Sequence, residues 1–427
     1  MSKPSRTENA GSPLVVAPHF VSHPGQDGAH YIDPLDGSNH VWVVKRNSSK
    51  VEKVPWGQQV HKGGNALLSP IPLATSFGMP PEGVHGGIGQ HTDRILDLLV
   101  AAVVVPPNTA PEDVRAVLRS YLYLQVLRHV LPVRPLLLLI GPPGTGKTFM
   151  ARVVGRLLFG PKFEVTMRPI CRRDALAMLA NAPLIVFDNM EVLPDETCDL
   201  LCSVVTQVEL QTRQLYTEAQ VCRIRPDTFL MLTTVSGGGI RGDLLDRSIP
   251  IRFSGLPDGT HLSENRLLEQ VDEARPFFWW KLISTIAALL PRLPGNPPAS
   301  KDRLVDFRYY GGEIAEVVGG PVERARFEKG FDSLRAERFR VLGEANPILS
   351  AILDALAAGP VVDDAAGWIR RVVSDLGMST TETASLHAAW GVGAKFREIK
   401  KTSAGIVTWT QVPRAHGRAR KWRGELP

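Results

Sequence analysis

Eight consecutive residues carry the clearest chemical signal in this sequence: Gly141, Pro142, Pro143, Gly144, Thr145, Gly146, Lys147 and Thr148. Glycines let a loop wrap around phosphates and direct its backbone N–H groups inward. In such a loop the lysine reaches the β- and γ-phosphates, and the hydroxyl that follows it binds Mg²⁺. The spacing is that of a P-loop, and it predicts a site for ATP, or another nucleoside triphosphate, together with Mg²⁺.

The residues on either side of the loop indicate how it is positioned. A continuous aliphatic run at 136–140 precedes it, and an amphipathic stretch follows it, with Val153, Val154, Leu157 and Leu158 on one helical face. A strand before the loop and a helix after it place the phosphates at a helix N-terminus, where unpaired amides and the helix dipole favour anions. The flanking pattern therefore supports the P-loop prediction.

A second polar position follows another apolar strand. Asp188 comes directly after 184–187, where a P-loop protein needs an acid to hold Mg²⁺ through water. The next residue is Asn189, whereas many hydrolysing P-loop proteins carry there a glutamate that polarises the attacking water. Glu191 lies two residues beyond Asn189 and is the remaining candidate for that role. The pattern predicts nucleotide binding and leaves hydrolysis dependent on Glu191.

Arg247 is a candidate of a different kind. It stands just before a predicted strand at 249–253. An arginine in this position can complete the site of a neighbouring subunit and stabilise charge developing on the γ-phosphate. The alternative is a surface salt bridge with Asp243 or Asp246, which sequence order alone favours.

Around these residues, predicted strands alternate with predicted helices. The expected strands are 136–140, 163–166, 184–187, 228–233 and 249–253, and helices are expected near 175–179 and at 197–208. Several of the strands are apolar throughout, which is typical of strands buried on both faces of a sheet. The predicted fold class is α/β, with a parallel sheet at the P-loop core.

One predicted helix bears on the question of metal sites. In 197–208, one helical face gathers Cys198, Leu201, Cys202, Val205 and Val208. Because these two cysteines share an apolar face, we interpret them as core residues rather than metal ligands. Four cysteines in 427 residues do not form a disulfide framework either.

Composition changes along the chain predict five parts. They are a β-rich or partly extended N-terminal region at 1–93, a helical lead-in at 94–134, the P-loop core at 135–260, a helical domain at 261–344 and a basic domain at 345–427. No secretory signal is expected, and the most apolar runs are too short to span a bilayer. A cytoplasmic protein with no membrane partner is therefore expected.

The charge of the chain is concentrated at one end. The net charge is +6, yet from Lys395 onward nine lysines and arginines stand against only two glutamates, so the rest of the chain is near neutral. A concentrated basic end predicts a surface for phosphates, such as those of DNA. The alternative is a solvated tail that aids solubility.

Taken in order, these motifs resemble a known family. The sequence is similar to the helicase half of phage- and virus-type primase-helicases, the superfamily 3 branch of AAA+ ATPases, and more closely to ATPases of actinobacterial plasmids and integrative elements. The matching landmarks are 141–148, 187–194, 212–217 and 243–248. The resemblance implies a DNA-dependent ATPase or helicase that forms a homo-oligomeric ring, with a hexamer as one option.

The resemblance also implies roles for single residues. The segment with Arg213, Gln214 and Tyr216 corresponds to a hairpin that enters the central pore, where arginine grips phosphates and tyrosine stacks on bases. Val235 stands where the family has an asparagine that contacts the γ-phosphate, so Thr234 or Ser236 must substitute for it or the contact is absent. Arg247 matches the arginine that acts across subunits. An ordinary hairpin with Tyr216 packed on the core is the alternative for the first of these.

The C-terminal part resembles the winged-helix domain that often follows such ATPases. The recognition helix would lie at 390–401, and a wing would begin at 408. A recognition helix reads the major groove, and basic wing residues contact phosphates. The implied DNA contacts are Lys395, Arg397, Lys400, Lys401, Arg414 and Arg418.

Three functions are compatible with these patterns. The first is a DNA-dependent ATPase or helicase in the replication or maintenance of a mobile element. The second is an ATP-binding switch or DNA-binding adaptor with slow or no hydrolysis, which Asn189 and Val235 favour. The third is an ATPase serving a protein partner in a defence or transposition complex.

Overall fold

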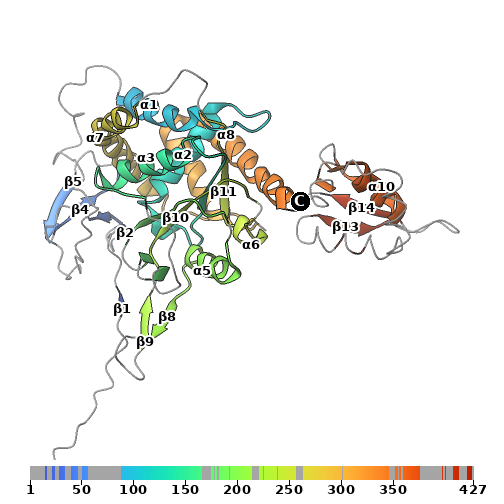
Figure 1. Cartoon of the computed structure of the whole chain (residues 1–427). Coiled ribbons are helices and arrows are strands. Elements are labelled where there is room, and N and C mark those ends of the chain that lie inside the picture. The colour runs from blue at the N-terminus through green and yellow to red at the C-terminus, as the bar shows by residue number, and fades with distance from the viewer. Residues whose placement is uncertain are drawn as a thin grey trace, which may run out of the picture.

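The computed structural model describes the chain most continuously between residues 88 and 375, with shorter pieces on either side (Figure 1). The described residues are 15–16, 22–24, 28–33, 40–46, 51–55, 88–165, 175–176, 178–179, 182–191, 193–213, 221–224, 226–237, 239–255, 263–300, 302–345, 352–353, 355–356, 359–375, 397, 400, 407–412 and 421–425.

A parallel sheet forms the centre of the molecule. Its strands are β6 (Leu136–Ile140), β7 (Leu184–Phe187), β10 (Phe229–Thr234) and β11 (Ser248–Arg252), in the spatial order β11-β6-β10-β7. Every pairing is parallel, so the carboxyl ends of all four strands lie at one edge. The predicted α/β class with a parallel sheet is confirmed, and the arrangement is consistent with a P-loop fold.

Side-chain alternation along the strands divides the core in two. In β6, Leu137 and Leu139 enter one apolar cluster, whereas Leu136, Leu138 and Ile140 enter the other. Since both faces are covered, each strand is apolar at nearly every position, which explains the continuous aliphatic runs.

Helices cover both faces of the sheet. The first cluster is shared with α1 (Ile88–Ala101), α2 (Pro111–Leu124), α3 (Lys147–Phe159), α7 (Glu264–Leu289) and α8 (Val305–Ala345). The second is shared with α5 (Asp195–Val205), α6 (Gly242–Leu245) and the end of α8. Short 3-10 turns, η1 (Arg128–Val130) and η2 (Leu290–Arg292), follow α2 and α7.

The longest helix, α8, is broken near its middle. Gly319 and Gly320 leave helical geometry, with Gly320 at φ 70°, and Pro321 restarts the helix. Only glycine takes this left-handed conformation without strain. The second half then packs so closely on α2 that a Cβ at Gly330 would lie 2.3 Å from the Asp113 carbonyl oxygen.

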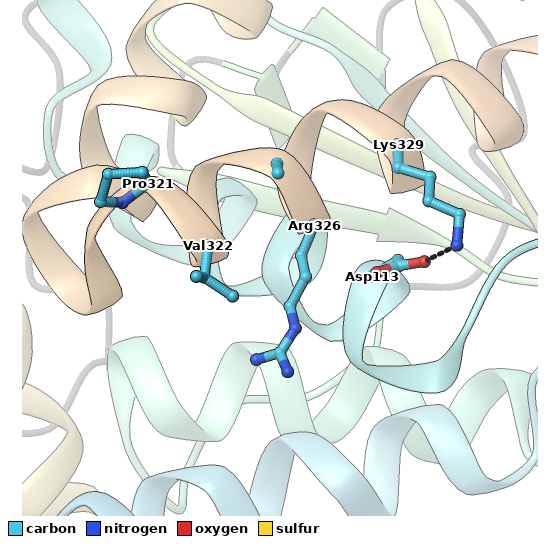
Figure 2. Close-up of a pocket in the computed structure, with 6 residues that line it drawn as sticks. Asp113, Pro321, Val322, Arg326 and Lys329 are labelled. Carbon is cyan, nitrogen blue, oxygen red and sulfur yellow. Dashed lines mark ion pairs between the residues drawn. The ribbon is translucent and has the colours of Figure 1, made fainter.

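A shallow pocket lies beside this contact, at the first turn of α2 (Figure 2). Lys329 of α8 forms an ion pair of 3.0 Å with Asp113 there, and Val322 is largely exposed. The pocket is lined by Asp113, Pro321, Val322, Ala325, Arg326 and Lys329.

Within the described residues, three smaller sheets accompany the central one. An antiparallel hairpin of β8 (Leu210–Arg213) and β9 (Val221–Ile224) extends away from it and pairs with β1 (Val15–Val16) (Figure 1). An antiparallel sheet holds β2 (Ser22–Pro24), β3 (His30–Ile32), β4 (His40–Val44) and β5 (Val51–Pro55). The third sheet has the order β12 (Val361–Asp364), β14 (Lys421–Glu425), β13 (Thr408–Gln411), and α10 (Ala365–Asp375) follows β12.

Some sequence expectations about these elements were wrong. Of the strand expected at 163–166, residues 163–165 are not in a strand and residue 166 lies outside the described residues; the Phe163 ring packs on Gly155, where a Cβ would lie 2.0 Å from it. Val208 does not belong to the buried helical face, since α5 ends at Val205 and Val208 is 52% exposed. Cys198 is buried and Cys202 half-buried on α5, which confirms the interpretation as core residues.

Two absences concern only the described part of the chain. Its helices include none long and apolar enough to cross a membrane. Nor do its histidines, cysteines and acidic residues gather into a group of three or more that could hold a metal ion.

Candidate active site

The P-loop connects the carboxyl end of β6 to the first turn of α3, as its flanking residues predict. Gly144 and Gly146 have φ values of 78° and 92°, which a residue with a side chain rarely adopts. Gly141 is needed for another reason, because a Cβ there would lie 2.4 Å from the Phe253 carbonyl oxygen. The loop hydrogen-bonds to itself through the Thr145 hydroxyl, which donates to the Pro142 carbonyl at 2.8 Å.

Lys147 is the first residue of α3 and is only 8% exposed. Its ammonium donates to the carbonyls of Gly141 and Pro142, at 2.6 and 2.7 Å. Burial lowers the pKa of Lys147, while the negative charge of Asp188 acts in the opposite direction. The cation is therefore held inside the loop, close to the amides that a phosphate would contact.

Thr148 and Asp188 meet beside the loop. The Thr148 hydroxyl donates to Asp188 Oδ1 at 3.0 Å, across 40 residues of sequence. Thr233, at the end of β10, donates its hydroxyl to the same oxygen at 2.5 Å and accepts the Asn189 N–H at 2.8 Å. A hydroxyl and a carboxylate are oxygen ligands of the kind that Mg²⁺ prefers.

The other polar candidates near β7 and β10 are arranged differently. Asn189 is exposed and left-handed, with φ 57°, and Glu191 is also exposed. Thr234 is fully buried, and its hydroxyl donates to the Ser236 carbonyl at 2.8 Å. The Thr234 hydroxyl is thus already bonded within the chain, whereas Thr233 contacts Asp188.

A cavity of about 930 Å³ opens directly beside the P-loop. Its walls come from α1, the P-loop, the first turn of α3, the segment after β11 and the start of α7. The lining is mainly apolar, with Leu98, Leu99, Ala102, Phe149, Met150, Phe253 and Leu267 among its members. Such a space next to a phosphate loop fits the flat apolar faces of a nucleotide base.

Arg247 lies at the opposite edge of the sheet from the P-loop. Its carbonyl accepts the N–H of Leu136 at 2.9 Å, at the first residue of β6, whereas the P-loop begins after the last. Five residues of strand separate the two edges by roughly 16 Å. Arg247 therefore lies too far away to contact the phosphates of its own subunit.

The salt bridge expected as the alternative for Arg247 does not form. The Asp243 carboxylate pairs with Arg241 at 2.6 Å, and the Asp246 carboxylate pairs with Arg338 at 3.1 Å. Arg247 instead donates to the backbone carbonyl of Asp243 at 2.5 Å. With the described residues it forms no ion pair.

The residues implied in DNA contact are described only in part. Arg213 ends β8, while Gln214, Tyr216, Lys395, Lys401, Arg414 and Arg418 lie outside the described residues. Arg397 is helical and exposed. Lys400 is also helical, and its Nζ lies 3.6 Å above the Trp422 ring.

Sequence reasoning missed two features of this site. Thr233 was named only within a strand, although a hydroxyl at a strand end beside Asp188 signals a hydrogen-bonding role. The cavity walls from α1 and α7 were missed because they come from segments that carry no motif.

Comparison with known proteins gives one family match. Residues 107–295, somewhat less than half of the chain, match the family described as actinomycete integrative conjugative element replication protein. The match includes the P-loop, Asp188 and Arg247. No curated protein matches the chain.

Several solved structures are similar to the chain at low identity. The C-terminal region of NrS-1 is 13% identical, with 91% of this chain and 94% of that one covered and a TM-score of 0.35. The Cch helicase of SCCmec type IV is 13% identical, with 79% and 68% covered and a TM-score of 0.36. The JCV helicase is 14% identical, with 63% and 65% covered and a TM-score of 0.28.

Proposed function

We propose that the protein is an oligomeric AAA+ ATPase that binds ATP and Mg²⁺ and uses them to act on DNA during replication of a mobile element. The observation that carries this proposal is the contact between Thr148 and Asp188 at the N-terminus of α3. It brings the two expected Mg²⁺-binding groups together beside a buried lysine. The phosphates, the Mg²⁺ ion and the Lys147 ammonium would thus lie together at the carboxyl edge of the sheet.

The cavity beside the P-loop supports the nucleotide assignment independently. The phosphate groups would lie on the loop amides, and the base would enter the apolar space between α1 and α7. Phe149, Phe253 and Leu267 are among the apolar residues that line this space. Base burial adds affinity that the charged groups alone do not provide.

The position of Arg247 supports an assembly of subunits. Each subunit would carry a phosphate site at one edge of its sheet and an arginine at the other. A contact between two different surfaces of identical subunits is head-to-tail, and such contacts close into rings when the rotation permits. Arg247 would then reach the nucleotide of the next subunit, with Lys147 and Asp188 acting in their own.

The order of elements at the C-terminal end supports a winged helix for 345–427. Strand β12 is followed by α10, by the helical positions of Arg397 and Lys400, and then by β13 and β14. β14 lies between β12 and β13, so the two last strands form a hairpin next to the first. Arg397 is exposed on the helical segment that would enter the major groove.

The family match supplies the biological setting. The matched segment contains the P-loop, Asp188 and Arg247, and the matching family is described as a replication protein of an actinomycete integrative conjugative element. DNA is the polyanion that such a protein would act on, and the basic end of the chain fits it.

The decisive experiment is ATP turnover by the full chain with and without single-stranded DNA, together with a mass measurement in the presence of nucleotide. The proposal expects turnover that DNA stimulates and a mass of several subunits. Absence of turnover, with a nucleotide-bound monomer, would rule out the motor.

DNA contact by the C-terminal part needs its own test. Replacing Lys395, Arg397 and Lys401 by glutamine should reduce the slope of log affinity against log salt by about 0.9 for each phosphate of duplex DNA that is no longer neutralised. A matched variant removes the charges of Arg46, Lys53 and Lys162, which are exposed elsewhere. Equal slopes for both variants would show that the basic end does not bind DNA.

A second candidate function rests on Asn189. Its amide stands where a hydrolysing P-loop protein has a carboxylate, and its φ of 57° is one that asparagine adopts more readily than glutamate. A nucleotide-dependent switch that assembles on DNA and hydrolyses slowly fits this residue. Nucleotide-dependent assembly with turnover unaffected by Glu191→Gln would favour the switch.

A further inference from the structure

The turn that carries Arg247 is held by a helix nearly ninety residues away in sequence. It runs from the end of α6 into β11, and the distal half of α8 packs along it. Because α6 is only four residues long, it has little stability of its own and leaves its last carbonyls without helical partners.

Arg335 of α8 donates hydrogen bonds to backbone carbonyls at the end of α6 and just after it. Its side chain is buried, and Nη1 donates to the carbonyls of Ser248 at 2.9 Å and Leu245 at 3.3 Å. Nη2 donates to the Asp246 carbonyl at 3.0 Å and to Asp302 Oδ1 at 2.8 Å. The guanidinium thus bonds to the backbone on both sides of Arg247.

A buried arginine is retained only where acceptors compensate for its lost hydration. Burial lowers the pKa of Arg335, and the charge of Asp302 acts in the opposite direction. The planar guanidinium, with its donors in a fixed fork, suits several acceptors at once, which a lysine does not.

Neighbouring residues of α8 hold the same region at further points. Arg338 pairs with Asp246 at 3.1 Å, and Glu337 pairs with Arg252 of β11. Glu344 accepts the N–H of Gly237, in the loop after β10, at 3.2 Å. One half-helix therefore contacts the turn, the strand after it and the loop after β10.

We propose that Arg335 is a positioning residue, which fixes the backbone around Arg247 so that the Arg247 side chain is presented to the nucleotide of the neighbouring subunit. This inference rests on the proposed function, in which Arg247 acts across subunits. Arg335 itself contacts neither nucleotide nor metal, since it lies at the opposite sheet edge from the P-loop.

The first test compares Arg335→Lys with Arg326→Lys, both in the full chain. Arg326 is on the same helix and pairs with Glu323 at 3.1 Å, away from the turn. Arg335→Lys should lower kcat on the order of tenfold to a hundredfold, as small displacements of a catalytic group do. KM for ATP and affinity for a fluorescent nucleotide should stay unchanged, whereas Arg326→Lys should keep the wild-type kcat.

Double variants and mixed assemblies then separate positioning from general destabilisation. Arg335→Lys should add nothing to Arg247→Ala, because both remove the same group from the neighbour's site. Mixed with Lys147→Ala subunits, Arg335→Lys subunits should regain activity, and mixed with Arg247→Ala subunits they should not. Multiplicative losses, or recovery in both mixtures, would overturn the proposal.

Failure of the proposed function gives a different result. If Arg247→Ala retains wild-type turnover, the role of Arg247 is wrong whatever Arg335 does. If Arg247→Ala is defective and Arg335→Lys is not, only the present inference fails. Should Arg335→Lys not fold, Arg338→Met must show a smaller loss of kcat in the same direction, and an unchanged kcat would overturn the proposal.

Discussion

The two edges of the parallel sheet are built in different ways. At the carboxyl edge, the P-loop is shaped by its own glycines, and its groups lie within eight consecutive residues. At the amino edge, the turn with Arg247 has no such local design and depends on Arg335 and Arg338 of α8. A binding loop of this kind can be recognised from sequence, whereas a group that serves a neighbour can be positioned by distant parts of the chain.

The largest effect should come from the carboxyl edge. Lys147→Ala should abolish turnover and weaken nucleotide binding by roughly 2–5 kcal/mol, the range for removing one partner of a buried charged pair. Titration with a fluorescent nucleotide measures this, and Lys162→Ala, an exposed lysine just beyond α3, is the control. Unchanged nucleotide affinity in folded Lys147→Ala protein would show that the P-loop does not bind the nucleotide.

At the amino edge, Arg247→Ala should lower kcat by about 10³-fold or more while leaving nucleotide affinity intact. Steady-state ATP hydrolysis and equilibrium binding separate the two quantities, with Arg266→Ala, exposed on α7, as the control. If nucleotide affinity fell together with kcat, Arg247 would belong to its own subunit's site, and the contrast between the edges would be lost.

A smaller effect is expected at Thr233 of β10, which hydrogen-bonds to Asp188 and Asn189 after β7 at the carboxyl edge. Thr233→Val removes the hydroxyl that orients Asp188 and should lower the affinity for Mg²⁺ about 10- to 100-fold. Mg²⁺ titration of nucleotide binding or turnover provides the measurement. Thr233→Ser keeps the hydroxyl and should therefore keep most of the wild-type Mg²⁺ affinity. Equal Mg²⁺ affinities of the two variants would exclude the orienting role.

The smallest effect should appear at low pH, on the amino edge. Asp227 is largely buried, which raises its pKa, but Arg128 and Arg134 outweigh burial and hold the pKa below its usual value. Its stabilising contribution is therefore complete above about pH 4 and lost as pH falls through the lowered folded-state pKa. Thermal unfolding between pH 6 and pH 3 should show a steeper acid loss for the wild type than for Asp227→Asn.

The same pH series sharpens the comparison within that edge. Three of the four acceptors around Arg335 are backbone carbonyls, which carry no ionisable proton, and the fourth is the Asp302 carboxylate. An Arg335→Lys variant should therefore lose stability by nearly the same amount at every pH in the range. A strong pH dependence of that difference would show that the Asp302 carboxylate, rather than the backbone carbonyls, accounts for the contribution of Arg335.

The features that could be predicted from the sequence depend on residues that lie close together in the chain. The P-loop, the strand before it and the helix after it follow from one run of residues. Asp188 could be placed because an acid directly after a second apolar strand is the residue that a P-loop requires to hold Mg²⁺. The hairpin of β8 and β9 was expected only from the family resemblance, and the antiparallel pairing of the two strands agrees with it.

What could not be predicted depends on distant contacts. Nothing near Arg335 signals that its guanidinium would reach residues 245–248, and sequence order does not reveal that Arg241 occupies the Asp243 carboxylate in place of Arg247. Phe163 belongs to the strand expected at 163–166, yet its ring packs on Gly155 of α3 instead. In each case the three-dimensional arrangement, rather than the local pattern, decided the outcome.

The break in α8 has a consequence for how the protein opens locally. Gly319 and Gly320 interrupt the ladder of helical hydrogen bonds, and Pro321 has no N–H to continue it. Amide hydrogens just after the break should exchange with solvent faster than those on either side, within a single element of 41 residues. The two halves of α8 nevertheless pack on each other, through the ring of Phe307 against Phe327 and Phe331 and through the ion pairs of Arg308 with Glu328 and Asp332, so opening at the break should leave both halves folded.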